Sequence, residues 1–272
     1  MAENPALRLD KSINLTTRLI KKRGQQMPHI KKTVYAGKTI ETKKYYTKRC
    51  HTKGVKRGKN CKPTPEKMAL INEKNSEDSL RHSINTNFSY GDLHATLTYK
   101  KESRPGTEES KKELQNYLRR LKTLYRRNDA ELKYITVTEY KNTAIHHHII
   151  INMPDGINVR DIDKTWGKGR IRFTYLDDSG NYAALAHYLI KETRKTFKEE
   201  GSPSKRRWNP SRNLKKPIIK KEIIKSNEWR KEPKAIKGYM LEKNSIQEGF
   251  NDITGWPYQK YTMIKIKEKK RC

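Results

Sequence analysis

The sequence predicts an α+β fold in which an antiparallel sheet carries helices on one face. Three observations between residues 92 and 198 support this class. Apolar residues recur with a period of two in some segments and with a helical period in others. These segments follow the order strand, helix, strand, strand, short helix, strand, helix. The two central strands are joined by a short polar turn at residues 141–144, so we expect a split βαβ arrangement.

The composition indicates a nucleic-acid partner. The 272 residues include 62 Lys and Arg against 30 Asp and Glu, a formal charge of +32, and only 33% are hydrophobic. A charge of this size repels itself unless a polyanion is present, so nucleic acid is favoured over a membrane surface. No apolar run approaches 18 residues and no signal-peptide segment is found, so we expect no membrane association. Cys50, Cys61 and Cys272 show no disulfide or metal spacing, and their odd number indicates a reducing compartment.

Charge and apolar content divide the chain into three predicted parts. Residues 1–63 are rich in Lys and Arg, lack a lasting apolar period, and are expected to form a flexible basic arm. Residues 64–200 contain the alternating elements and are expected to form the core. Residues 201–272 form a basic C-terminal extension, in which Tyr258–Lys267 is a predicted strand.

Each element of the core has its own signal. Thr64 followed by Pro65 predicts an N-cap and the first helical residue of a helix that ends near Asn85. Residues 92–100 alternate as a strand, in which His94 is expected to be structural. A second helix begins at Thr107, and its apolar residues recur at helical spacing. The remaining predictions are strands at 132–140, 144–152 and 170–176, and helices at 159–166, capped by Asn158, and 181–198.

Three consecutive histidines lie within the predicted strand Ala144–Asn152. Side chains alternate between the two faces of a strand, so His146 and His148 point one way and His147 points the other. Two imidazoles on one face, about 7 Å apart by strand rise, can share a metal ion. We interpret this pair as a candidate metal site.

Glu139, near the end of the preceding strand, is the candidate third ligand. If Tyr140 pairs with Ile145 across the turn, Glu139 lies opposite His146 and points the same way. A slip of one residue would move it to the other face. Nitrogen and oxygen ligands together suit Mn²⁺ or Mg²⁺ and do not exclude Zn²⁺.

Tyr188 and Lys191 lie three residues apart in the last predicted helix, so they share a face. A tyrosine hydroxyl can attack a phosphodiester when the developing charge is stabilised by a metal ion, and an ammonium can position the phosphate. The spacing of Tyr188 and Lys191 carries little information alone. Its significance comes from its place one strand and one helix after the histidine pair.

Together these motifs resemble those of the HUH endonucleases, in particular the rolling-circle replication initiators of small bacterial plasmids and phages. The resemblance covers about residues 88–198. Residues 92–99 are similar to the first motif, His146-His147-His148 to the second, and Tyr188 with Lys191 to the third. A histidine, His147, stands where the second motif has a hydrophobic residue. Tyr182 is a second tyrosine of the kind that some relatives use, but it lacks a lysine three residues later.

The resemblance implies a ferredoxin-like core and a nicking and joining reaction on single-stranded DNA at a replication origin. Tyr188 would form a 5′-phosphotyrosine, with Lys191 orienting the tyrosine or the metal. The metal, Mn²⁺ or Mg²⁺, would be held by His146, His148 and Glu139. The resemblance implies no nucleotide cofactor, action in the cytoplasm of a bacterial host, and dependence on the host helicase and polymerase.

Basic residues after the core are candidates for contact with the DNA backbone. Trp208 stands among cations and suits stacking on bases, although core packing explains it equally well. The candidate DNA-binding residues are Arg194, Lys195, Lys205, Arg206, Arg207 and Trp208.

Three other functions stay open on the sequence. A relaxase or transposase would use the same chemistry. A non-catalytic basic DNA- or RNA-binding protein is supported equally well by the composition. A metal-dependent hydrolase would use activated water and would form no protein–DNA adduct.

Overall fold

The computed structural model describes residues 28–47, 63–141, 144–193, 206–226, 228–251 and 254–266. Two compact units divide the chain. The central unit comprises residues 35–39 and 64–218, and the terminal unit comprises residues 1–34, 40–63 and 219–272. None of the described helices is both long and apolar enough to cross a membrane.

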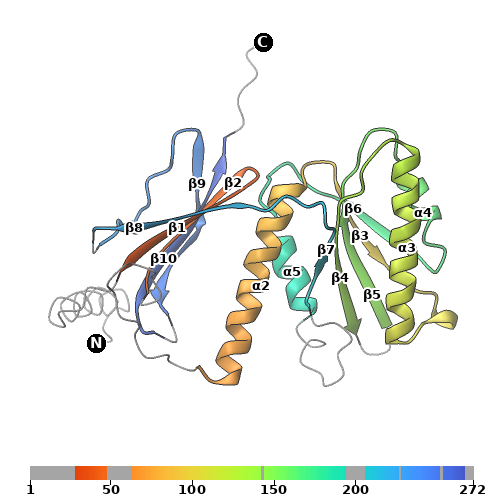
Figure 1. Ribbon diagram of the computed structural model, residues 1–272, viewed down its shortest axis with the longest axis horizontal. Coiled ribbons are helices and arrows are strands. Elements are labelled where there is room, and N and C mark those ends of the chain that lie inside the picture. The colour runs from red at the N-terminus through yellow and green to blue at the C-terminus, as the bar shows by residue number, and fades with distance from the viewer. Residues whose placement is uncertain are drawn as a thin grey trace, which may run out of the picture. The chain divides into compact units, whose positions relative to one another are not determined.

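The central unit is built on a five-stranded antiparallel sheet with the order β6-β3-β5-β4-β7. Its first four strands and the helices between them form the predicted split βαβ arrangement, so the α+β class is confirmed (Figure 1). The elements are α2 (Pro65–Asn87), β3 (Leu93–Leu97), the 3₁₀ turn Lys101–Ser103, α3 (Thr107–Arg127), β4 (Tyr134–Lys141), β5 (Ala144–Ile151), α4 (Val159–Lys164), β6 (Ile171–Tyr175), α5 (Ala183–Glu192) and β7 (Asn209–Pro210).

Helices lie against both faces of this sheet, whereas the sequence predicted helices on one face. On one side, α3 and α4 cover a core that includes Leu97 and Ile149. On the other side, α2 and α5 cover a core that includes Ile135 and Ile150. Figure 1 shows α3 and α2 on opposite sides of β4 and β5. The reason is that β4 and β5 are apolar at alternate and at adjacent positions, so both faces need to be covered.

Local signals positioned the helices as expected. The Thr64 side chain accepts a hydrogen bond from the Lys67 amide at the start of α2. The Asn158 side chain accepts one from the Asp161 amide at the start of α4. Both caps satisfy amide groups that have no partner within the helix.

The terminal unit is a second antiparallel sheet, with the strand order β8-β1-β2-β10-β9. Its strands come from both ends of the chain, so neither end forms it alone. The strands are β1 (His29–Ala36), β2 (Thr39–Tyr46), β8 (Ile218–Ile224), β9 (Tyr239–Phe250) and β10 (Pro257–Lys265).

The expectation of a flexible arm over residues 1–63 is wrong for residues 29–46, which form β1 and β2. The strand pattern is hidden in the sequence because several inward positions carry polar residues. Thr33 and Thr42 are buried together with Val34 and Ile40. The rest of the predicted arm lies outside the described residues. The predicted basic extension contributes β8, β9 and β10, and β10 confirms the predicted strand at its start.

Candidate metal and nucleophile site

The register of β4 against β5 brings the three candidate ligands to one face of the sheet. Glu139 lies opposite His146, and Tyr140 lies opposite Ile145. This confirms the predicted register. The face is the one covered by α2 and α5, because Ile135, Val137 and Ile150 on the same face belong to that core.

Glu139 lies in contact with both imidazoles. Its Oε2 atom is 3.4 Å from His148 Nε2 and 3.8 Å from His146 Nδ1. Glu139 and His148 are buried, whereas the side chain of His146 is 32% exposed. The cluster is therefore closed on the side of the sheet and accessible at His146.

His94 and Thr96 on β3 join this cluster, although the sequence predicted only a structural role for His94. His94 Nε2 is 3.2 Å from His148 Nδ1, and Thr96 Oγ1 is 3.3 Å from the same nitrogen. The His94 and His148 rings are stacked with centroids 5.4 Å apart. The missed signal was the spacing within β3, where His94 and Thr96 alternate with buried apolar residues and so share a face.

Burial keeps these imidazoles neutral. Burial, followed by the charge of His146, lowers the pKa of His148 to about 4. Burial, followed by His148 and Arg172, lowers the pKa of His94 to about 4. A neutral imidazole has a free nitrogen lone pair, which is the form that binds a metal ion.

His147 faces the opposite core, as alternation predicted. It is fully buried, with Nε2 2.9 Å from Tyr99 Oη and Nδ1 3.0 Å from Thr138 Oγ1. The Trp166 ring lies edge-on to it at 6.2 Å. Both ring nitrogens are satisfied, so a polar residue is tolerated where a hydrophobic one would otherwise fit.

The donor chemistry of Glu139, His146 and His148 fits a divalent metal ion. Ligand atoms bound about 2.1 Å from a common ion are themselves roughly 3–4 Å apart, and the two measured separations lie in that range. In the described residues, no group of three or more His, Cys, Asp or Glu side chains is already arranged around a common metal position. Binding would therefore require small side-chain rotations at the exposed His146.

Tyr188 lies beside the cluster on α5. Its ring meets the His148 ring edge-on, with centroids 5.6 Å apart, and the residue is 42% exposed. Burial, followed by Glu192 and Glu139, raises the pKa of its hydroxyl, whereas Arg172 lowers it. The hydroxyl is therefore protonated near neutral pH and accessible to a large substrate.

Tyr182 is placed differently. It is buried at the start of α5, and its hydroxyl donates a hydrogen bond to the Asp177 carbonyl at 2.9 Å. Its ring belongs to the core beneath α2 and α5. The geometry thus favours Tyr188 as the tyrosine that a DNA phosphate can reach.

Two cations lie near Tyr188. Lys191 is exposed one helical turn after it on the same face of α5. Arg172, which sequence reasoning missed, is exposed on β6 directly opposite Thr96 of the cluster. It is near enough to influence the pKa of both His94 and Tyr188. A lone arginine on an edge strand has no sequence signal that separates it from the many other cations.

The predicted DNA-binding residues are only partly described. Arg194, Lys195 and Lys205 lie outside the described residues, and Arg206 is exposed. Arg207 is buried, pairs with Glu73 at 3.4 Å and lies 3.4 Å from Thr193 Oγ1. This guanidinium serves the structure, so we leave it out of the proposed DNA contacts. Trp208 packs against the core beneath α2 and α5.

Comparison with known proteins identifies one family. Residues 92–196 match the family model of the replication-associated proteins of the ORF2 type. No curated protein and no solved structure matched the chain. The matched segment contains β3, β5, the histidine cluster and Tyr188. Over this segment the chain is similar to replication-associated proteins, which indicates a role in DNA replication.

Proposed function

We propose that the protein initiates rolling-circle replication by nicking and rejoining single-stranded DNA through Tyr188. One observation carries the proposal. The Tyr188 ring contacts His148, whose opposite edge contacts the buried carboxylate of Glu139. A nucleophile and a set of metal-binding side chains thus meet on one accessible face of the sheet. The match to replication-associated proteins supports the same role.

Glu139, His146 and His148 would hold Mn²⁺ or Mg²⁺. When bound there, such an ion polarises a phosphoryl oxygen and offsets charge in the transition state. Glu139 fixes the orientation of both imidazoles, and His94 with Thr96 holds the other side of the His148 ring. These contacts hold His148 ready for ligation.

Tyr188 supplies the nucleophile. Its oxygen forms a bond to phosphorus, the bond from phosphorus to the 3′-oxygen breaks, and the phenolic proton is released while the leaving oxygen takes up a proton. The products are a 5′-phosphotyrosine and a free 3′-hydroxyl that can prime synthesis. Attack by a new 3′-hydroxyl reverses the step and restores Tyr188. The bond energy is retained, so no nucleotide cofactor is needed.

Lys191 and Arg172 flank the nucleophile and act on the phosphate. Both are exposed on elements adjacent to Tyr188, where a DNA backbone can reach them. Charge-assisted hydrogen bonds from such groups position a phosphodiester and stabilise the phenolate as it forms. Unwinding and synthesis would be the work of the host helicase and polymerase.

The test is covalent capture of DNA. The protein is incubated with Mn²⁺ and labelled single-stranded DNA that carries the candidate origin hairpin of its own replicon, then separated on a denaturing gel. We expect a shifted protein–DNA band that is lost with EDTA and in Tyr188→Phe. The matched control is Tyr90→Phe, because Tyr90 is also exposed and lies outside the cluster; this variant should capture DNA normally.

Other outcomes contradict the proposal in distinct ways. Cleavage without an adduct would identify water as the nucleophile and a metal-dependent hydrolase. Binding with neither cleavage nor an adduct would leave a non-catalytic binding protein. A relaxase or transposase would form the same adduct, so a second arm is needed. A plasmid with the gene and its origin should replicate with the wild type and fail with Tyr188→Phe.

A further inference from the structure

The terminal unit contains a basic pocket that the proposed nicking reaction does not use. Its volume is about 530 Å³, the size of a small-ligand site, and β1, β2 and the segment after β8 form its walls. Five cationic side chains and two carboxylates line it. The cations are Lys31, Lys44, Lys225, Arg230 and Lys234, and the carboxylates are Glu222 and Glu228.

The cations of this pocket are not fully neutralised from within. Burial, followed by the neighbouring Lys31 ammonium, lowers the pKa of Lys44. The Lys44 ammonium is 3.2 Å from Gln259 Oε1, which is a neutral acceptor. Lys31 pairs with Glu222 at 3.5 Å, but both side chains are substantially exposed, so this pair is weak. Like charges held together in this way favour an anionic ligand.

Aromatic side chains line the same pocket. The Trp229 ring lies 5.3 Å from the His29 ring and 6.2 Å from the Tyr46 ring, and His29 is stacked on Tyr46 at 4.6 Å. His29 also contacts the Ser226 carbonyl through Nδ1 at 2.7 Å, which anchors the segment that carries Trp229. Trp229 is therefore held in a fixed position beside the cations.

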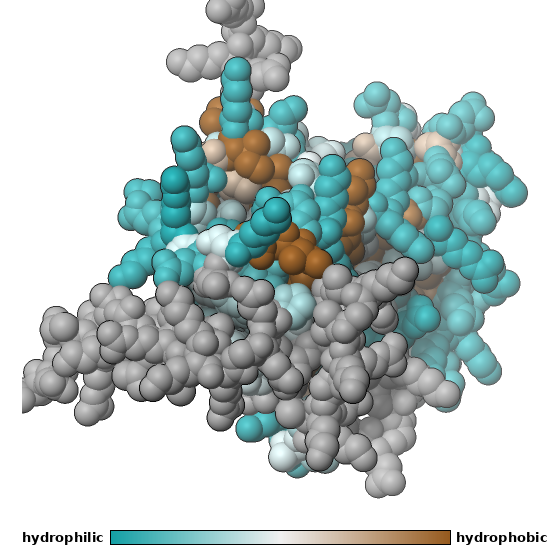
Figure 2. All heavy atoms as spheres, turned by 60° about the vertical axis from the view of Figure 1, so that its left-hand side comes forward, coloured by the Kyte–Doolittle hydropathy of each residue, from teal (hydrophilic) through white to brown (hydrophobic). Residues whose placement is uncertain are grey.

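An aromatic ring beside clustered cations is the combination that single-stranded nucleic acid requires. Lysines contact the phosphates, and bases stack on the ring without sequence preference. Figure 2 shows that the face brought forward from the left of Figure 1 is mostly hydrophilic, with small hydrophobic areas between long side chains. This surface suits a polar, charged ligand better than an apolar peptide.

We propose that this pocket binds single-stranded nucleic acid, with a backbone phosphate at Lys31 and Lys44 and an unpaired base against Trp229. A base in a duplex is stacked and paired, so it cannot enter a pocket of this kind. The proposal goes beyond the nicking activity, because the pocket belongs to the unit that lacks Tyr188 and the histidine cluster. It gives the terminal unit a function as a second nucleic-acid site.

Equilibrium binding tests the lysine pair. Full-length protein is titrated into fluorescently labelled oligo-dT in EDTA, so that no metal-dependent nicking contributes, and anisotropy is recorded from 50 to 300 mM NaCl. We expect Lys31→Gln/Lys44→Gln to weaken binding about tenfold and to reduce the slope of log K against log[salt] by about 1.4, since two phosphate contacts are lost. The matched control is Lys243→Gln/Lys265→Gln, which removes equal charge from exposed positions of β9 and β10.

Equal losses in the two lysine variants would overturn the proposal, because net charge alone would then explain binding. An equal loss for a blunt duplex would also overturn it, since the site would not be specific for single strands. A parallel titration with oligo-rU distinguishes DNA from RNA as the preferred ligand, and weakened binding of either in the Lys31→Gln/Lys44→Gln variant supports the site.

Trp229 provides an independent readout. Oligo-dT should quench tryptophan fluorescence in the wild type, and Trp229→Leu should remove most of this quenching and weaken binding about tenfold. Thermal unfolding of the variant shows whether the fold is intact. Full quenching in a folded Trp229→Leu variant would contradict the assigned base position. Because all measurements are made in EDTA, their failure would leave the Tyr188 proposal unaffected, and loss of covalent capture would leave this one unaffected.

Discussion

Glu139 carries the most specific chemistry of any single residue in the site. It is only 5% exposed, yet it is an acid among two imidazoles rather than part of an ordinary ion pair with Lys or Arg. A buried carboxylate is costly unless it is paired or coordinates a metal ion. Neutral imidazoles offset this cost only in part, which is why the site favours a cation.

Substitution of this carboxylate tests the metal set directly. Glu139→Gln keeps the size and the hydrogen-bonding oxygen but removes the charge. We expect Mn²⁺ affinity to fall at least about tenfold, because first-row divalent ions bind carboxylate far better than amide oxygen. The measurement is the electron paramagnetic resonance signal of free Mn²⁺ during a titration, which does not depend on activity.

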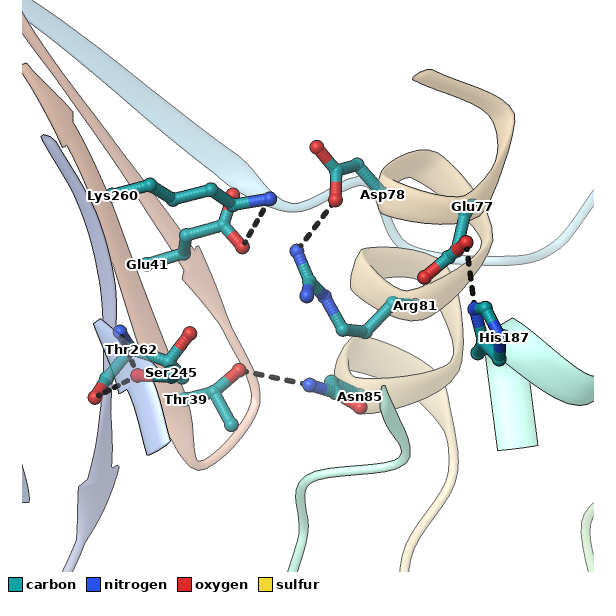
Figure 3. A network of polar contacts seen from close by, with 10 residues as sticks. All are labelled: Thr39, Glu41, Glu77, Asp78, Arg81, Asn85, His187, Ser245, Lys260 and Thr262. Carbon is teal, nitrogen blue, oxygen red and sulfur yellow. Dashed lines mark hydrogen bonds and ion pairs between the residues drawn. The ribbon is translucent and has the colours of Figure 1, made fainter. Parts of the chain in front are cut away.

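The chain offers a matched control for this substitution. Glu77 on α2 also contacts an imidazole, with Glu77 Oε2 3.1 Å from His187 Nδ1, but the pair is exposed and stands alone (Figure 3). Glu77→Gln should leave Mn²⁺ binding unchanged. Equal binding by the wild type and both variants would show that Glu139 is not a ligand.

At the scale of elements, the sequence predicted those whose apolar residues are regular. Helix α3 and strand β5 were placed within about a residue because Tyr117, Leu121, Ile149 and Ile151 follow the helical or strand period without interruption. Strands β1 and β2 were missed because threonine and histidine occupy inward positions. Polar residues are tolerated there because they find hydrogen bonds within the sheet unit, and such bonds have no sequence period.

The same limit applies to the site. The ligands Glu139, His146 and His148 could be predicted because a short turn fixes the register of two adjacent strands. The contributions of His94 and Arg172 depend on how β3 and β6 pair with β5, through strands distant in sequence. Pairing between distant strands is set by the whole core and leaves no local pattern.

The turn before β6 tests how closely two elements must approach. Gly169 lies against the backbone of the residues after β3, and an added Cβ atom would lie 2.1 Å from the Thr98 carbonyl oxygen. Backbone cannot move aside as a side chain can, so Gly169→Ala should lower the free energy of unfolding by about 2 kcal/mol or more. Urea denaturation, monitored by circular dichroism, measures the change.

Gly106→Ala is the control for that substitution. Gly106 has a negative φ of −69° at the start of α3, and an added Cβ atom would meet nothing within 4 Å. We expect a change of less than about 1 kcal/mol. If the two variants were equally stable, the close approach of the strand ends would not limit the sequence at Gly169.

At the scale of the whole molecule, charge opposes folding. A formal charge of +32 on 272 residues brings many ammonium and guanidinium groups closer together in the folded state than in the unfolded chain. Repulsion between exposed charges is screened over about 10 Å at 0.1 M salt. The pocket of the terminal unit concentrates this repulsion, since its cations outnumber its carboxylates.

Salt should therefore stabilise the free protein. We expect the midpoint of thermal unfolding to rise by several degrees between 50 and 500 mM NaCl in EDTA, as measured by differential scanning fluorimetry. Added DNA is a less direct probe, because the unfolded chain keeps the same charge and binds polyanions as well, which reduces any gain in stability. Sucrose at matched osmolality is the control for non-ionic effects. A midpoint that falls with salt would mean that attractive ion pairs outweigh repulsion, and that the excess positive charge is neutralised within the fold itself and is not held for a nucleic-acid partner.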